Sequence, residues 1–168
     1  MAWLARRRVS LGLLTAVLAA ALARPTWASW QAGLIVAAAG EAVRVWAAGH
    51  LEKSREVTTS GPYRWTRHPL YVGSTVMVAG IVLASRSAVV AICATIYMAV
   101  TLTAAIRTEV AFLRQAFGDA YDRYQRREAT PSVRRFSLAR AMRNREYRAV
   151  AGLLLGFALL ALKIAGPI

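Results

Sequence analysis

The side chains best suited to chemistry lie in residues 61–73, GPYRWTRHPLYVG. Gly61 and Pro62 break regular structure, and Pro69 suits the first turn of a following helix. Basic side chains supply hydrogen-bond donors and two tyrosines supply hydroxyls; these are Arg64, Arg67, His68, Tyr63 and Tyr71. An apolar run begins at Leu70, so the segment predicts a polar site at the start of a membrane-length helix.

The composition favours a membrane protein with one domain, residues 1–168. Hydrophobic residues make up 57% of the chain and the mean hydropathy is +0.40, both high for a soluble protein. A net charge of +14 suggests nucleic acid in a polar chain, but here the basic residues lie between apolar runs. Orientation in a bilayer explains them, and we expect no nucleic-acid partner. One cysteine, Cys93, and two histidines predict no metal site.

The apolar runs predict an all-α integral membrane protein with about five transmembrane helices. The spans are residues 9–23, 31–48, 70–84, 88–106 and 149–165. The third and fourth are separated only by Ser85, Arg86 and Ser87, which predicts a tight turn and a helical hairpin. Gly73, Ser74 and Gly80 in the third span favour close helix packing.

The first run allows two interpretations. Arg6 to Arg8, a short apolar region and small residues at 21–23 are typical of a cleavable signal peptide, and Arg7 with Arg8 hints at a twin-arginine signal. Further spans follow and would direct insertion themselves, which favours a retained helix that extends towards Trp27.

Glu41 and Arg44 are ionisable residues inside the second span, one helical turn apart on the same face. Such residues are costly in a membrane and usually face protein or a water-filled cavity. Two interpretations remain open at this stage: a mutually compensating pair near the headgroups, or a wall of a polar pocket.

Residues 107–127 predict a cytosolic amphipathic helix. Their apolar and aromatic residues recur at spacings of three and four, at Val110, Leu113, Phe117, Tyr121 and Tyr124. This face is expected to pack under the membrane domain, and Pro131 follows the helix. The arginine-rich segment after Arg123 is interpreted as a lipid-facing surface that sets topology.

Charge supports this topology. Eighteen Lys and Arg residues lie in the N-terminus and in residues 49–67 and 107–148, against three, Arg24, Arg86 and Lys163, on the other side. The positive-inside rule therefore predicts a cytosolic N-terminus and an outside C-terminus. It also predicts that residues 61–73 and the amphipathic helix share the cytosolic side.

Two motifs resemble the membrane-embedded isoprenylcysteine carboxyl methyltransferases and the related phospholipid methyltransferases. One is GPYRWTRHPLYVG. The other comprises Arg107, Glu109, Leu113, Phe117, Gly118, Tyr121 and Tyr124. The motifs flank the helical hairpin, and the resemblance covers residues 31–127.

The resemblance implies an enzyme that uses S-adenosylmethionine to methylate a lipidic or hydrophobic acceptor drawn from the bilayer, by isoprenylcysteine-type carboxyl methylation or a related reaction. It also implies which residues bind the cofactor: Val57, Thr58, Tyr63, His68, Pro69, Leu70, Tyr71 and Glu109. Their chemistry agrees, because a carboxylate can hold ribose hydroxyls or an ammonium and an aromatic face attracts a sulfonium. Tyr121 and Tyr124 are expected to be structural.

The sequence departs from the family pattern at two points. Val110 stands where the family usually has a second acidic residue, and Arg107 is the candidate for an arginine on the substrate side. Two alternatives follow: a membrane reductase with a nicotinamide cofactor, suggested by the helical core and the late tyrosines, or a non-catalytic relative, suggested by Val110.

Overall fold

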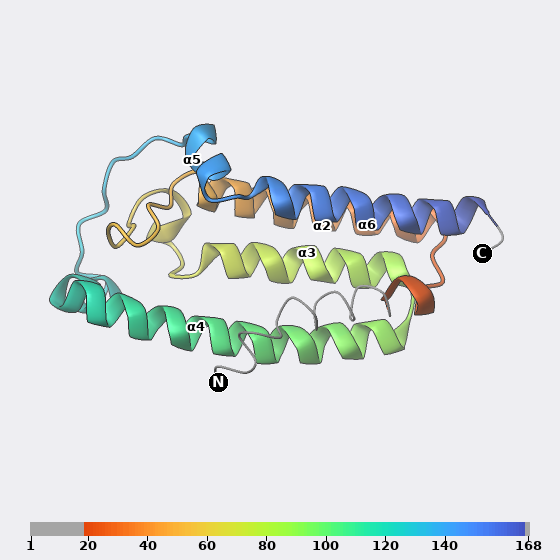
Figure 1. Ribbon diagram of the computed structural model, residues 1–168, viewed down its shortest axis with the longest axis horizontal. Helices are drawn as coiled ribbons and strands as arrows, with labels where there is room; N and C mark the ends of the chain where they lie inside the picture. The colour runs from red at the N-terminus through yellow and green to blue at the C-terminus, as the bar shows by residue number, and fades with distance from the viewer. Residues whose placement is uncertain (1–18, 167–168) are drawn as a thin grey trace.

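The computed structural model describes residues 19–166, and within them every regular element is helical. Four long helices lie along one direction, with the loops of the predicted site at one end (Figure 1). The elements are α2 (Trp27–Ala48), the 3₁₀ turn η1 (Gly61–Arg64), α3 (Pro69–Ser85), α4 (Ala88–Gln125), α5 (Leu138–Arg143) and α6 (Tyr147–Ala165). The all-α prediction is confirmed.

The turn between α3 and α4 forms where the sequence predicts it. Arg86 adopts the left-handed conformation, with φ 49°, and ends α3. The Ser87 hydroxyl then accepts a hydrogen bond from the backbone N–H of Val90, 3.4 Å away, and caps α4. The predicted hairpin is thereby confirmed.

α2 and α3 pack backbone against backbone through glycines. A Cβ at Gly40 would lie 2.4 Å from the Met77 backbone nitrogen, and one at Gly80 would lie 2.4 Å from that of Ala37. Gly73 and Gly80 confirm the prediction of close packing in the third span, while their partners Gly33 and Gly40 on α2 were not predicted. The close approach fixes α3, and with it the start of the helix that carries the site.

α6 packs against α2 near the N-terminal end of α2. The Trp30 indole N–H donates to the backbone oxygen of Phe157 at 2.8 Å, and the two rings meet edge to face with centroids 5.8 Å apart. The buried core here comprises Ala23, Ala37, Ala84, Leu153, Phe157 and Leu160. By contrast, α4 leaves large apolar side chains exposed, among them Ile92 and Ile96, as expected of a surface that faces lipid.

The predicted amphipathic helix is not separate from the fourth span. α4 continues from the apolar run into residues 107–117 without a break, but it comprises two helical parts that meet at a kink at Gly118, where φ is 45° and ψ is −121°. The predicted amphipathic helix is therefore interrupted at Gly118. No proline or turn signal separates the apolar and amphipathic parts, so the helix runs on. Beyond residue 106 it therefore projects past the apolar segment, and its inner face meets the loops.

The prediction of five spans is not confirmed. By length and composition α4 and α6 qualify as candidate membrane spans within residues 19–166, and α3 is a shorter apolar helix of 17 residues. Gln31, Glu41 and Arg44 lower the hydropathy of α2. The first expected span, with the signal-peptide alternative, lies mostly in residues 1–18, outside the described part.

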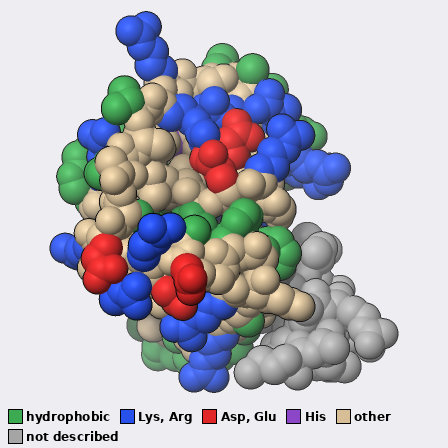
Figure 2. All heavy atoms as spheres, turned by 90° about the vertical axis from the view of Figure 1, so that its left-hand side faces the viewer, with side chains coloured by type: hydrophobic (Ala, Val, Ile, Leu, Met, Phe, Trp, Pro, Cys, Tyr) green, Lys and Arg blue, Asp and Glu red, His purple; other side chains and the backbone are tan. Residues whose placement is uncertain are grey.

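The basic residues form two groups, one at each end of the bundle. The Arg24 backbone N–H donates to Ser85 O at 2.7 Å beside Arg86, and Lys163 Nζ donates to Ala20 O and Ala21 O at 2.8 and 2.7 Å. At the opposite, loop end Lys and Arg side chains cover much of the surface, with acidic side chains between them (Figure 2). This grouping matches the expected one.

Candidate functional site

A cavity of about 570 Å³ lies at the loop end of the bundle. Its walls come from the loop after α2, the start of α3, the inner face of α4 and the residues before α6. All eight residues expected to bind a cofactor line it: Val57, Thr58, Tyr63, His68, Pro69, Leu70, Tyr71 and Glu109. Arg107, the candidate on the substrate side, is exposed and does not line the cavity.

Local sequence places the first motif on the cavity wall. Gly61 has φ +56°, and a Cβ there would meet the His50 ring at 2.6 Å, so glycine is required by both conformation and space. Pro69 begins α3 and His68 precedes it in a non-helical conformation. The rings of His68 and Tyr71 then stack with centroids 5.5 Å apart.

Glu109 joins the two motifs. Its Oε2 lies 3.5 Å from His68 Nδ1, and its carboxylate also accepts a hydrogen bond from the Tyr71 hydroxyl. Burial raises the pKa of Glu109, but the contacts with His68 and Tyr71 outweigh it and hold that pKa below its ordinary value. The cavity thus contains a carboxylate that is charged at neutral pH.

The tyrosines keep their protons. Burial, followed by the charge of Glu109, raises the pKa of Tyr63, and burial raises the pKa of Tyr124 to about 12. The Tyr124 hydroxyl donates to the backbone oxygen of Tyr63 at 2.9 Å. This bond is the structural role expected of Tyr124, but both Tyr121 and Tyr124 also line the cavity.

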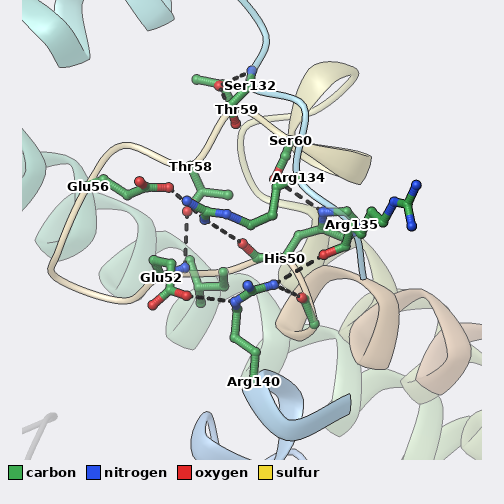
Figure 3. Close-up of polar contacts among 12 residues, drawn as sticks. His50, Glu52, Glu56, Thr58, Thr59, Ser60, Ser132, Arg134, Arg135 and Arg140 are labelled. Atoms are coloured by element: carbon green, nitrogen blue, oxygen red, sulfur yellow. Dashed lines mark hydrogen bonds and ion pairs between the residues drawn. The ribbon is translucent and has the colours of Figure 1, made fainter. Parts of the chain in front are cut away.

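The loop that forms one cavity wall, residues 49–60, is held by the chain that follows α4 (Figure 3). Arg140 Nε pairs with Glu52 Oε1 at 2.7 Å and Arg140 Nη1 donates to Gly49 O at 2.5 Å. Arg134 Nη1 pairs with Glu56 Oε1 at 2.7 Å. The arginines of this segment were predicted to face lipid; Arg134 and Arg140 instead bind the cavity loop.

Arg140→Gln is expected to loosen this loop without unfolding the helices. The change removes the charge-assisted contact with Glu52 and weakens the hydrogen bond to Gly49 O. We expect the backbone amides of residues 50–58 to exchange hydrogen about tenfold faster, measured by hydrogen–deuterium exchange with mass spectrometry.

Arg126→Gln is the matched control, because Arg126 forms an exposed ion pair with Glu128 at 3.0 Å. It should leave exchange in residues 50–58 unchanged. Equal exchange in both variants would show that Arg140 does not hold the loop.

Glu41 and Arg44 form a buried cluster with a third charge. Arg44 Nε lies 3.3 Å from Glu41 Oε2, and Arg44 Nη2 lies 2.5 Å from Glu146 Oε1. Arg44 Nη1 also donates to the Ser74 hydroxyl. Glu41 and Arg44 do pair, as one interpretation had it, but Arg44 also pairs with Glu146. The cluster lies inside the protein and reaches the cavity through Glu146.

Within residues 19–166 no group of three or more His, Cys, Asp or Glu side chains is placed to hold a metal ion. The glutamates that line the cavity form ion pairs, and Glu109 also accepts a hydrogen bond from the Tyr71 hydroxyl. The fold and this cavity define a small protein whose described part is all helical and includes two helices long and apolar enough to cross a membrane, with a pocket that contains paired ionisable groups at one end of the bundle.

The chain belongs to the phospholipid methyltransferase family, whose sequence model matches residues 17–120. This confirms the resemblance and identifies the protein as a member of a methyltransferase family. The match ends before the segment that binds the cavity loop and before α6.

Two curated relatives are 36% identical to the chain over 86 residues, which is 50% of the chain. They are the nickel-cobalt-cadmium resistance protein NccN of Alcaligenes xylosoxydans xylosoxydans and the cobalt-zinc-cadmium resistance protein CzcN of Cupriavidus metallidurans. The aligned part spans 40% and 39% of their respective lengths. No solved structure shows a significant match.

Proposed function

We propose that the protein is an S-adenosylmethionine-dependent methyltransferase that acts on a lipidic or hydrophobic acceptor, such as an isoprenylcysteine-type carboxyl group, at the cytosolic membrane face. The observation that carries the proposal is the convergence of two separated motifs on one cavity. Glu109 lines it together with Val57, Thr58, Tyr63, His68, Pro69, Leu70 and Tyr71. Membership of a methyltransferase family supports the reaction class.

The residues present fit the cofactor. Tyr63 and Tyr71 offer aromatic faces to a sulfonium, and Glu109 offers a charged carboxylate to hydroxyls or an ammonium. His68 Nδ1 is buried and lacks a well-aligned hydrogen bond, so it retains capacity for a polar ligand. A volume of about 570 Å³ suits a ligand of this size together with the reacting end of an acceptor.

The apolar lining supports an acceptor with a hydrophobic chain. Val100, Thr101 and Ala104 extend the wall along α4 towards its apolar part. A hydrophobic chain lying along this surface would keep the polar reacting group at the loop end. The cytosolic placement of that end, with the N-terminus in the cytosol, follows from the charge asymmetry.

The side chains would act by positioning and electrostatics. When bound, S-adenosylmethionine supplies an activated methyl group on a sulfonium. Glu109 and His68 would orient the polar parts of the ligand, and the protonated hydroxyl of Tyr63 would donate a hydrogen bond, while the Tyr71 hydroxyl holds Glu109. Because a displacement reaction requires little covalent work from the protein, such orientation accounts for much of the expected rate.

Calorimetry on detergent-purified protein tests the proposal. S-adenosylmethionine and S-adenosylhomocysteine should bind, and NADPH should not. Preferential NADPH binding would favour the reductase alternative. No binding of either methyl-donor ligand to folded protein would refute the proposal and favour a non-catalytic relative.

A further inference from the structure

Glu146 is a cavity residue outside the part of the chain that matches the family. It precedes α6, and its residue exposure is 6%. The adjoining turn is fixed to the end of α2, because Asn144 Nδ2 donates to Ala48 O and Leu51 O, each at 2.9 Å. The carboxylate is therefore held against the cavity from the α6 side.

The cluster behind Glu146 contains two carboxylates and one guanidinium. Within residues 19–166 the ion pairs of Glu41 and Glu146 are all with Arg44, so one guanidinium serves two carboxylates. Both oxygens of Glu41 are buried and lack a well-aligned hydrogen bond. Two buried carboxylates that share one guanidinium are costly to keep charged, so they favour either a proton on Glu41 or a ligand that brings positive charge to Glu146.

Of the two carboxylates, Glu146 alone lines the cavity. Burial has the largest effect in raising the pKa of Tyr63, and the charges of Glu109 and Glu146 raise it further. Glu109 and Glu146 therefore both act on the Tyr63 hydroxyl. Two basic side chains that line the cavity have other interactions. Arg67 donates a hydrogen bond to the backbone oxygen of Gln125, and the charge of Lys53 helps to lower the pKa of Glu109. Glu52 and Glu56 form ion pairs with Arg140 and Arg134. These arginines belong to residues 128–146, the loop-binding segment, which follows α4 and holds residues 49–60.

We propose that Glu146, held in place by Arg44, binds a cationic centre in the cavity. Two ligands can supply that centre: the sulfonium of the methyl donor, or the ammonium nitrogen of an amine-headed acceptor. The inference rests on the proposed function and assigns the ligand charge that the α6 side of the site recognises.

Glu146→Gln removes the carboxylate charge and leaves Arg44 paired with Glu41, so the helical bundle is expected to stay folded. In calorimetry we expect the affinity for S-adenosylmethionine to fall about tenfold if the sulfonium is the centre. The affinity for S-adenosylhomocysteine, whose sulfur is a neutral thioether, should fall less than about twofold. A tenfold change corresponds to about 1.4 kcal/mol.

A second arm tests the acceptor. Dodecylamine and dodecanol are titrated in the same non-ionic detergent, with S-adenosylhomocysteine saturating. If the nitrogen is the centre, Glu146→Gln should weaken dodecylamine binding about tenfold and leave dodecanol binding unchanged. Glu146→Asp, which keeps the charge, should retain most of the preference for the cationic ligand in whichever arm responds.

Glu128→Gln removes an exposed carboxylate and should change neither comparison. If Glu146→Gln weakens the binding of each cationic ligand no more than the binding of its neutral counterpart, the inference is overturned while the proposed function stands. If the wild-type protein binds neither S-adenosylmethionine nor S-adenosylhomocysteine, both are overturned.

Discussion

Glu109→Gln is expected to lower the affinity for S-adenosylmethionine about 30-fold. Glu109 is the carboxylate that connects His68 and Tyr71, and the lowered pKa keeps it charged at neutral pH. The change replaces a charged acceptor by a neutral amide, which removes charge-assisted hydrogen bonds worth roughly 2 kcal/mol. That loss corresponds to about 30-fold in a dissociation constant and is measured by calorimetry.

Glu128→Gln again serves as the control, since it removes the same charge from an exposed ion pair with Arg126. A thermal unfolding curve for each variant separates loss of the site from loss of the fold. If Glu109→Gln folds and binds the cofactor as the wild type does, Glu109 has no part in the cofactor site.

The convergence of the residues expected to bind the cofactor was predictable because the motifs flank a hairpin. A tight turn at Ser85–Ser87 returns the chain to the end from which it started, so Glu109 must come back near His68. The residue types also indicated a site, because a carboxylate, an imidazole and tyrosines are suited to the same polar ligand. Whether these residues bind S-adenosylmethionine stays a prediction.

The loop-binding segment was not predictable from local sequence. Arginines in residues 128–146 indicate a charged surface, but their partners depend on the path of the chain after α4. That path brings Arg134 to Glu56 and Arg140 to Glu52. Glu146 was missed for the same reason, because its partner Arg44 lies about a hundred residues earlier.

The path of α4 shows the limit of periodicity. The spacing of Leu113, Phe117 and Tyr121 predicted a helix with an inner face, and Leu113 and Tyr121 do line the cavity. Periodicity does not show whether that helix is joined to the preceding span. The structure joins the two as far as the kink at Gly118, so one element carries both the exposed apolar side chains and Glu109.

Gly40→Val is expected to lower the free energy of unfolding more than any other substitution proposed above. The new Cβ would lie 2.4 Å from the Met77 backbone nitrogen and 2.6 Å from Gly73 O, and backbone atoms cannot move aside as a flexible side chain can. α2 and α3 must therefore separate, which would also disturb the Arg44 contact with Ser74. Overpacking of this kind costs about 3 kcal/mol, or roughly 6–12 °C in Tm for a chain of this size.

Gly156→Val provides a matched comparison for this change. Gly156 lies within α6, and a Cβ there would meet nothing within 4 Å. Because both substitutions place valine in a helix interior, intrinsic helix propensity contributes equally and the difference in Tm reports the contact with α3. Thermal unfolding in detergent, followed by tryptophan fluorescence, measures it. Equal Tm values for the two variants would mean that α2 and α3 are not held by glycine contact, and the fixed position of His68 at the start of α3 would need another cause.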